Sequence, residues 1–257
     1  MATPRKILIM GASYGSLLAI KLLLAGHNVK LICLPAEAEL FNTEGAIVRM
    51  PIKGREGLVQ LESRKAPGKL TAGGPESANP SDYDLVVLAM QEPQYKSPGV
   101  RELLDKVAMS RVPCMSIMNM PPLPYLARVP GIDVKACREC YAGPEVWDSF
   151  DPDSMTLCSP DPQAFRPPEE AANVLHVGLP TNFKAPVFAD EAHNRLPREW
   201  EEDIDAVSMA GPDVPVDHKV LGPRVVPRAT WPVARTGTRS RDAPRGPRHA
   251  RHGGPVR

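Results

Sequence analysis

The sequence has few aromatic residues and no long apolar segment. Aromatic side chains make up 5% of the 257 residues. No apolar run reaches the roughly 18 residues that a membrane-spanning helix needs. The chain enters the apolar run KILIM after five residues, and nothing in it resembles a secretory signal, so we expect none. We therefore expect a cytoplasmic protein with no membrane partner.

Cysteine is also scarce. The five cysteines stand at positions 33, 114, 137, 140 and 158, and an odd number favours reduced thiols in a reducing compartment. Cys137 and Cys140 form a C-x-x-C pair. A structural zinc site needs two further ligands, and a thioredoxin-type motif follows a first strand. Chance spacing is the favoured interpretation over a metal or redox site, so we expect no metal.

Proline is abundant and charge is unevenly distributed. The 30 prolines are more than twice the usual share of about 5%. Residues 211–257 hold 10 Lys and Arg against 3 Asp, which leaves 21 basic and 27 acidic residues in the rest of the chain. Nine Arg, eight Pro and six Gly in this tail leave little apolar surface to bury, so we expect it to be largely disordered. The tail has no fold to specify a sequence, so we expect no specific nucleic-acid binding.

The first 35 residues predict a strand–helix–strand unit. The apolar run 6–10 ends at Gly11, a Leu- and Ala-rich helix is expected over 16–26, and a second strand over 27–34. Strands joined in this way are parallel and the connection is right-handed.

The remaining chain supplies more strands and helices. A hairpin is expected over 46–50 and 57–63, buried strands over 82–90 and 112–119, a helix over 97–109, short strands over 154–159 and 173–179, and a last helix over 190–209. These elements predict an α/β protein with a Rossmann-type, doubly wound, mostly parallel sheet and an irregular C-terminal part. The expected domains are a dinucleotide-binding domain over 1–125, its remainder and the start of a C-terminal region over 126–210, and the tail over 211–257.

Residues 11–15, GASYG, permit two interpretations. They spell G-x-S-x-G, the nucleophile elbow of α/β-hydrolases. They also resemble the dinucleotide-binding loop G-x-G-x-x-G with Ser13 and Ser16 at glycine positions. An elbow needs strands and an oxyanion loop earlier in the chain, and only ten residues precede Gly11.

The dinucleotide loop belongs on the first strand–helix turn, where this motif stands. We therefore favour the dinucleotide interpretation, with an α/β sheet that binds no nucleotide as the alternative. The residues expected to cradle the pyrophosphate are Gly11, Ala12, Ser13, Tyr14, Gly15 and Ser16.

The preference for NAD or NADP is left open. NAD enzymes commonly carry Asp or Glu at the end of the second strand, and an Arg nearby accommodates the 2′-phosphate of NADP. Here Cys33-Leu34-Pro35 stands at that point, and Glu37 and Glu39 lie slightly too far along. No Arg stands there either, and Arg49, Lys53 and Arg55 are expected to be surface charges.

Four segments together resemble the ketopantoate reductase (2-dehydropantoate 2-reductase) family, or relatives of its N-terminal domain. They are KILIMGASYGSLLAIKLLLAGHNVKLI, NTEGAIVRMPIKG, DYDLVVLAMQEPQY and VPCMSIMNMPP, within residues 5–122. The resemblance implies that Gln91 and Asn119 line the nicotinamide of a bound NADP or NAD. Gln91 stands where the family has lysine, and Met120 where it has glycine.

The resemblance also implies a reaction. Members transfer hydride between nicotinamide and a small carbonyl or hydroxy-acid substrate, with Asn119 near the nicotinamide and a lysine of a helical C-terminal domain as general acid. Lys184 is the isolated candidate for that lysine. The alternative is a non-catalytic nucleotide-binding or interaction protein that keeps the Rossmann fold without a complete catalytic domain. A homodimer is left open.

Overall fold

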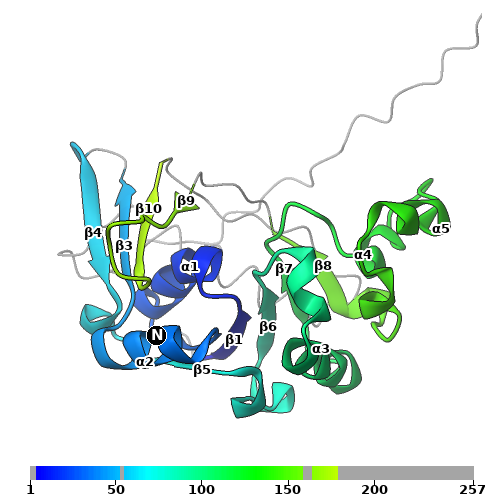
Figure 1. Cartoon of the computed structure of the whole chain (residues 1–257), viewed down its shortest axis with the longest axis horizontal. Coiled ribbons are helices and arrows are strands. Elements are labelled where there is room, and N and C mark those ends of the chain that lie inside the picture. The colour runs from blue at the N-terminus through cyan, green and yellow to red at the C-terminus, as the bar shows by residue number, and fades with distance from the viewer. Residues whose placement is uncertain (1–3, 53–54, 159–163, 179–257) are drawn as a thin grey trace, which may run out of the picture. The chain divides into compact units, whose positions relative to one another are not determined.

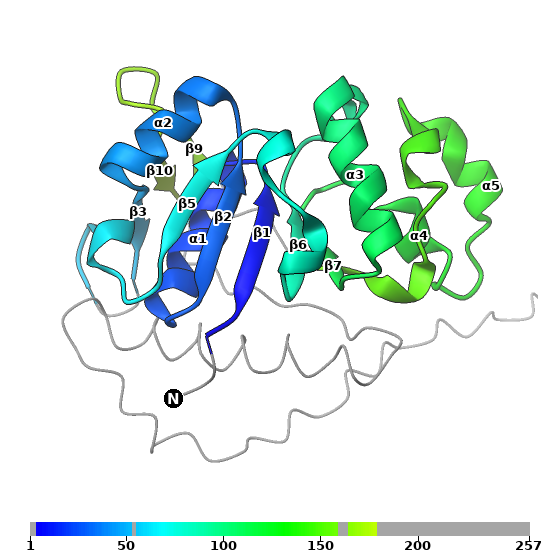
Figure 2. The ribbon, with the colours of Figure 1, turned by 90° about the horizontal axis from the view of Figure 1, so that it is seen from below.

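Two β-sheets organise the described chain, which covers residues 4–52, 55–158 and 164–178 of a computed structural model. All of these residues belong to one compact unit, Met1–Val220. Six parallel strands pair in the order β5-β2-β1-β6-β7-β8. Figure 2 shows β5, β2, β1, β6 and β7 in this order from left to right. Their bounds are β1 Lys6–Met10, β2 Asn28–Ile32, β5 Leu70–Gly73, β6 Leu85–Leu88, β7 Cys114–Ser116 and β8 Met155–Leu157. This strand order is that of a Rossmann-type, doubly wound sheet.

The second sheet has four strands in the order β4-β3-β10-β9. Their bounds are β3 Ile47–Pro51, β4 Leu58–Glu62, β9 Ala164–Phe165 and β10 Val174–Val177. The strands β3 and β4 form an antiparallel hairpin, and β10 pairs in parallel with β3 and antiparallel with β9. The second sheet therefore joins an early hairpin to a much later segment of the chain.

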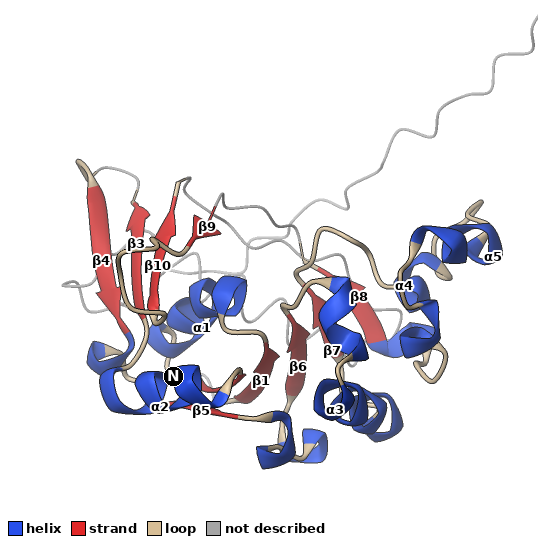
Figure 3. Ribbon diagram, viewed as in Figure 1, coloured by secondary structure: helices blue, strands red, loops and turns tan. Residues whose placement is uncertain are grey.

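Five α-helices accompany the sheets in the described residues. Their bounds are α1 Ser13–Leu24, α2 Pro35–Glu44, α3 Pro98–Ser110, α4 Leu123–Leu126 and α5 Val134–Cys137. Helix α1 contacts β1 and β2 of the first sheet and β3 and β10 of the second (Figure 1). Residues 15–23 of α1 are all buried, and most of them are apolar, as in a helix covered on most of its surface. Helices α3, α4 and α5 gather beside β7 and β8 (Figure 3).

Both faces of the parallel sheet are buried. Successive side chains of a strand point to opposite faces, and along β1 Ile7 and Ile9 join the core around α1, whereas Leu8 and Met10 join the core around α3. All four are fully buried. A strand covered on both faces has a continuous apolar sequence, which is the pattern of KILIM.

The predicted Rossmann-type α/β fold is confirmed, with local differences. Helix α1 begins at Ser13, before the expected residue 16, and α2 and β5 were not predicted. Only Ala38 and Phe41 of α2 are buried, so its sequence carries little apolar periodicity. The expected helix 190–209 and the tail 211–257 lie outside the described residues. Within the described chain, no helix is long and apolar enough to cross a membrane.

Candidate functional site

The turn after β1 requires glycine at position 11. Gly11 has a φ of 110°, a conformation that side chains disfavour. A Cβ atom there would lie 2.7 Å from the carbonyl oxygen of Ala89, which follows β6. The Gly11 N–H donates to the Ile32 carbonyl at 2.9 Å. The turn is thus wedged between the carboxyl ends of β2 and β6, where the strand order reverses.

The N-terminus of α1 faces this turn with unpaired backbone donors. The Ser16 N–H donates to the Ala12 carbonyl at 3.2 Å, so the N–H groups of residues 13–15 have no acceptor inside the helix. The first turn of α1 carries no acidic side chain. Free N–H groups and the positive end of the helix dipole favour an anion such as phosphate.

The close approach of α1 to the sheet depends on Gly15. A Cβ atom at Gly15 would lie 2.7 Å from Cγ2 of Ile9 in β1. Ser16 stands at the third glycine position of the motif, and its hydroxyl donates to the Ala12 carbonyl instead of contacting the strand. The packing role of the third glycine therefore belongs to Gly15, one residue early.

The geometry at Ser13 does not suit a hydrolase. A nucleophile elbow holds its serine in a strained turn between strand and helix. Ser13 is the first residue of α1, and among the described non-glycine residues only Arg111 has a positive φ, at 54°. Ser13 is therefore placed to present its backbone N–H and not a strained nucleophile.

The predicted nicotinamide residues Gln91 and Asn119 lie at the carboxyl edge of the sheet. Gln91 follows β6 and Asn119 follows β7, two paired parallel strands, and both residues are exposed. The Gln91 N–H donates to Oε1 of Gln94 at 2.8 Å, which closes the turn after β6. Lys184, the third predicted residue of this region, lies outside the described residues.

Tyr95 links the loops that carry these two residues. Its hydroxyl accepts from the Met90 N–H at 3.2 Å and donates to Sδ of Met118 at 3.1 Å. The side chain is fully buried, and this burial raises the pKa of the phenol well above its ordinary value. Met90 precedes Gln91 and Met118 precedes Asn119. Tyr95 therefore links the two loops through the residues next to Gln91 and Asn119. Sequence reasoning missed it, because a single Tyr between loops shows no periodicity.

The end of β2 carries an ion pair that sequence reasoning also missed. Glu37, in the first turn of α2, pairs through Oε1 with Nη1 of Arg166, which follows β9. Oε2 of Glu37 accepts from the Leu34 N–H at 3.4 Å. In the sequence Glu37 stands five residues after β2 and no Arg stands beside it, but the first turn of α2 brings Glu37 to the Leu34 N–H, and Arg166 reaches it from the second sheet.

The charges of this pair affect the pKa of the neighbouring Cys33 thiol. Burial and the Glu37 carboxylate raise the pKa of the Cys33 thiol from about 9 to about 11, and the Arg166 guanidinium lowers it. Both charged groups therefore act on the pKa of the first residue after β2.

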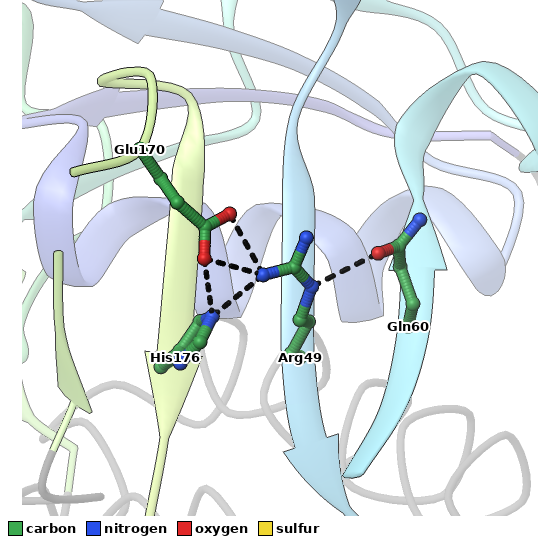
Figure 4. A network of polar contacts seen from close by, with 4 residues as sticks. All are labelled: Arg49, Gln60, Glu170 and His176. Atoms are coloured by element: carbon green, nitrogen blue, oxygen red, sulfur yellow. Dashed lines mark hydrogen bonds and ion pairs between the residues drawn. The ribbon is translucent and has the colours of Figure 1, made fainter. Parts of the chain in front are cut away.

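A polar network on the second sheet holds the segment that follows Arg166 against β3 (Figure 4). Nη1 of Arg49 in β3 donates to Glu170 at 2.6 and 2.7 Å, and Nε donates to Gln60 in β4 at 2.9 Å. Nε2 of His176 in β10 lies 2.8 Å from Arg49 and 3.2 Å from Glu170. Arg49 is thus held within the sheet, whereas Arg55 is exposed and Lys53 lies outside the described residues.

The cysteine pair and three aromatic residues lie in the segment between α4 and β8. Cys137 ends α5 and Cys140 ends the following 3-10 turn, and no three His, Cys, Asp or Glu side chains of the described chain are grouped as for a metal ion. Tyr141, Trp147 and Phe150 are buried in the core around α3.

Comparison with known proteins shows the fold. No family model and no curated protein matches this sequence. A candidate ketopantoate reductase of Ralstonia solanacearum MolK2 has a similar structure, with a TM-score of 0.56 at 15% identity over 79% of this chain and 59% of that one. A 2-dehydropantoate 2-reductase of Methylococcus capsulatus has a TM-score of 0.45 at 14% identity over 77% of this chain and 54% of that one.

A third solved structure is (S)-3-hydroxybutyryl-CoA dehydrogenase of Ralstonia eutropha. It has a TM-score of 0.42 at 13% identity, and the match covers 79% of this chain and 61% of that one. The chain spans less than two thirds of the length of each of the three proteins.

Proposed function

We propose that this chain binds NADP or NAD at the carboxyl edge of its parallel sheet and acts as an oxidoreductase of the ketopantoate-reductase-like type. The observation that carries the proposal is the Gly11 turn. It stands where the strand order reverses, and the space of a Cβ is taken by the carbonyl of Ala89. Dinucleotides bind at this point of doubly wound sheets. The similarity of the fold to a candidate ketopantoate reductase supports the type of reaction.

The residues around the turn fit a dinucleotide. The free N–H groups of residues 13–15 hold the pyrophosphate, and the first turn of α1 has no acidic side chain to repel it. Gln91 and Asn119 contact the nicotinamide side, with their loops fixed by Tyr95. When bound, the nicotinamide supplies hydride exchange with the carbon of a small carbonyl or hydroxy-acid substrate. The residues assigned to catalysis are Asn119 and Lys184.

The test of cofactor binding is a titration of the full chain with NADPH and with NADH, followed by cofactor fluorescence. Ser13→Asp adds a negative charge at the first helical position, where an acid stabilises the helix but repels phosphate. We expect saturable binding by the parent chain and at least a tenfold loss in Ser13→Asp. The matched control is Ser81→Asp, an exposed position before β6 at the opposite edge of the sheet. Equal binding by both variants would contradict the proposed site.

A second candidate function is nucleotide binding without catalysis. Hydride addition to a carbonyl creates an alkoxide that a general acid must neutralise. Gln91 and Asn119 are amides, which do not supply such a proton at neutral pH. Gln91 stands where the ketopantoate reductase family has lysine, and this replacement favours a chain that binds the cofactor and leaves it unchanged. Consumption of NADPH with a panel of small 2-oxoacids separates the two functions, with Lys184→Met and Asn119→Ala as the variants expected to abolish turnover but keep binding within a few fold.

A further inference from the structure

The C-x-x-C pair lies on one side of a single helical turn. Cys137 ends α5, and Cys140 ends the 3-10 turn Arg138–Cys140 that continues it. Side chains three residues apart on such a backbone lie on the same face. Cys140 is exposed, whereas Cys137 is half-buried and packs against the core around α3. One thiol is therefore open to a reagent in solution, and the second lies next to it.

The turn has the backbone spacing of a disulfide but not its side-chain spacing. Two Cα atoms three residues apart in a helix are separated by about 5 Å, within the roughly 4.4–6.8 Å of bonded cysteines. Their Cβ atoms lie about 5–6 Å apart, whereas a disulfide needs about 3.5–4.5 Å. Closure therefore draws the two residues together by about 1–2 Å. Because Cys137 is held by the core, the movement falls on the exposed Cys140 and on the residues after it.

The residue after Cys140 holds the loop that follows β7. The Tyr141 hydroxyl donates to the carbonyl of Pro121, two residues after Asn119. Tyr141 is buried. Burial first, and then neighbouring negative charge that includes the two thiolates, raises the pKa of this phenol to about 12. The thiols and the Tyr141 hydroxyl are therefore close neighbours.

The next two residues hold the loop that follows β6. The N–H groups of Ala142 and Gly143 donate to the Glu92 carboxylate at 3.2 and 2.7 Å. Glu92 is itself buried and directly follows Gln91. Nζ of Lys96 donates to the Ala142 carbonyl at 2.6 Å. The segment after the thiols thus joins both loops of the proposed nicotinamide site to the turn that carries the thiols. It is this link, and not the C-x-x-C spacing, that points to a function for them.

We propose that Cys137 and Cys140 form a reversible disulfide that weakens cofactor binding. The disulfide itself stands apart from the proposed function, whereas its effect on the cofactor rests on that function. A hydrogen bond that lengthens by 1–2 Å is lost, because its donor and acceptor must lie within about 3.2 Å. Closure therefore releases the contacts of Tyr141 and the two residues after it. The loops of Gln91 and Asn119 then lose a support that they share.

The oxidant is a small disulfide, of which oxidised glutathione is the example. The Cys140 thiolate attacks one of its sulfur atoms, and the other sulfur leaves as a thiolate. The Cys137 thiolate then attacks Sγ of Cys140 and releases the second glutathione. Two protein thiols become one disulfide, one glutathione disulfide becomes two thiols, and the protons lost by the cysteines end on the glutathione sulfurs. An exposed thiol beside a resolving thiol is the arrangement of redox-sensing cysteines.

The first test identifies the bond. The full chain is equilibrated in glutathione buffers of rising oxidised fraction, its free thiols are blocked with iodoacetamide, and it is cut with trypsin and chymotrypsin. The two cysteines then lie in the separate peptides 136–138 and 139–141, which only a disulfide keeps together. We expect mass spectrometry to find the joined peptides in the oxidised parent chain and to lose them after dithiothreitol.

The second test measures the effect on the cofactor. Titration with NADPH and with NADH, followed by cofactor fluorescence, gives the Kd of the reduced and of the oxidised parent chain. We expect oxidation to raise the Kd at least fivefold, about the effect of one lost hydrogen bond, and dithiothreitol to restore it. Coupling between two equilibria is reciprocal, so saturating cofactor is expected to move the glutathione ratio at half-oxidation by the same factor. Cys140→Ser, at an exposed position, is expected to bind like the reduced parent in every buffer.

Three variants test the order of attack and the link to the loops. Cys137→Ser lacks the resolving thiol, so Cys140 is expected to keep a bound glutathione. Tyr141→Phe removes the hydroxyl that bonds Pro121, so part of the link is already absent. We expect the oxidised-to-reduced ratio of Kd to fall at least twofold in this variant. Tyr125→Phe, in α4, is its matched control and is expected to respond like the parent.

The outcomes distinguish this inference from the proposed function. If the reduced parent chain binds neither NADPH nor NADH, both fall, whatever the peptides show. If a cofactor binds but the disulfide is absent at every glutathione ratio, or forms without a change in Kd, the inference falls and the proposed function stands. A disulfide, a raised Kd and a reciprocal shift in the parent chain, all absent from Cys140→Ser, support it.

Discussion

The contact between α1 and β1 makes Gly15→Ala the sharpest test of how the glycine turn is built. The new Cβ would lie 2.7 Å from Cγ2 of Ile9, well inside the 3.5–4.0 Å at which carbon atoms attract. Ile9 is fully buried, so neither side has room to move. Overpacking of this kind costs about 1–3 kcal/mol, and Ala gains about 0.5 kcal/mol over Gly near the start of a helix. We expect a net loss of about 0.5–2.5 kcal/mol.

The same substitution in another helix provides the control. A Cβ at Gly99 in α3 would meet only Pro75, with the nearest atom at 3.6 Å, which is an ordinary contact. Gly99→Ala is therefore expected to gain about 0.5 kcal/mol from helix propensity alone. Urea unfolding followed by circular dichroism gives the free energy of unfolding for both variants.

A second substitution tests the cause of the loss. Ile9→Leu removes the Cγ2 methyl group at similar volume, a change that usually costs less than about 1.5 kcal/mol. In a double-mutant cycle, Gly15→Ala is expected to cost at least about 1 kcal/mol less in the Ile9→Leu background. A Gly15→Ala variant as stable as the parent chain, or two substitutions that add without coupling, would contradict a steric contact between Gly15 and Ile9.

Three further predictions concern single residues. Tyr95→Phe removes a buried hydroxyl with two partners and is expected to cost about 1–2 kcal/mol in urea unfolding, with weaker NADPH binding because both carboxyl-edge loops lose their link; unchanged binding and stability would contradict this role. Burial and Glu37 raise the Cys33 pKa from about 9 to about 11, so at pH 8 iodoacetamide is expected to label the exposed Cys140 and spare Cys33, as peptide mass spectrometry would show. Glu92→Ala leaves the Gly143 N–H, now bonded to the carboxylate at 2.7 Å, without its acceptor, and is expected to lower the melting temperature by several degrees.

Much of the fold is predictable because its central strands are buried on both faces. Continuous apolar runs such as 6–10 and 82–90 mark β1 and β6 whatever their neighbours are. Ser97 and Pro98 likewise predict the start of α3. By contrast, β5 has the sequence LTAG with all four residues half-buried. Nothing in such a segment separates a strand from a loop, because its pairing with β2 is a tertiary contact.

The candidate site is predictable only where it is local in sequence. The Gly11 turn and the N-terminus of α1 follow from a short motif and its place after the first strand. Arg166 does not, because it reaches Glu37 through a sequence separation of 129 residues. Tyr95 is missed for a related reason: its partners, Met90 and Met118, lie in two different loops. Side chains brought together by sheet topology leave no periodic signal.

The pairing of β10 with β3 has a consequence for how the chain folds. His176 lies opposite Arg49 in this register, 127 residues further along. During synthesis the β3–β4 hairpin therefore leaves the ribosome long before the strand that covers its open edge. Contacts so distant in sequence slow folding, and an uncovered strand edge invites pairing with another chain. A nascent chain that stalls before residue 174 exposes that edge, so chaperone binding should be strongest in this interval and fall once β10 has emerged.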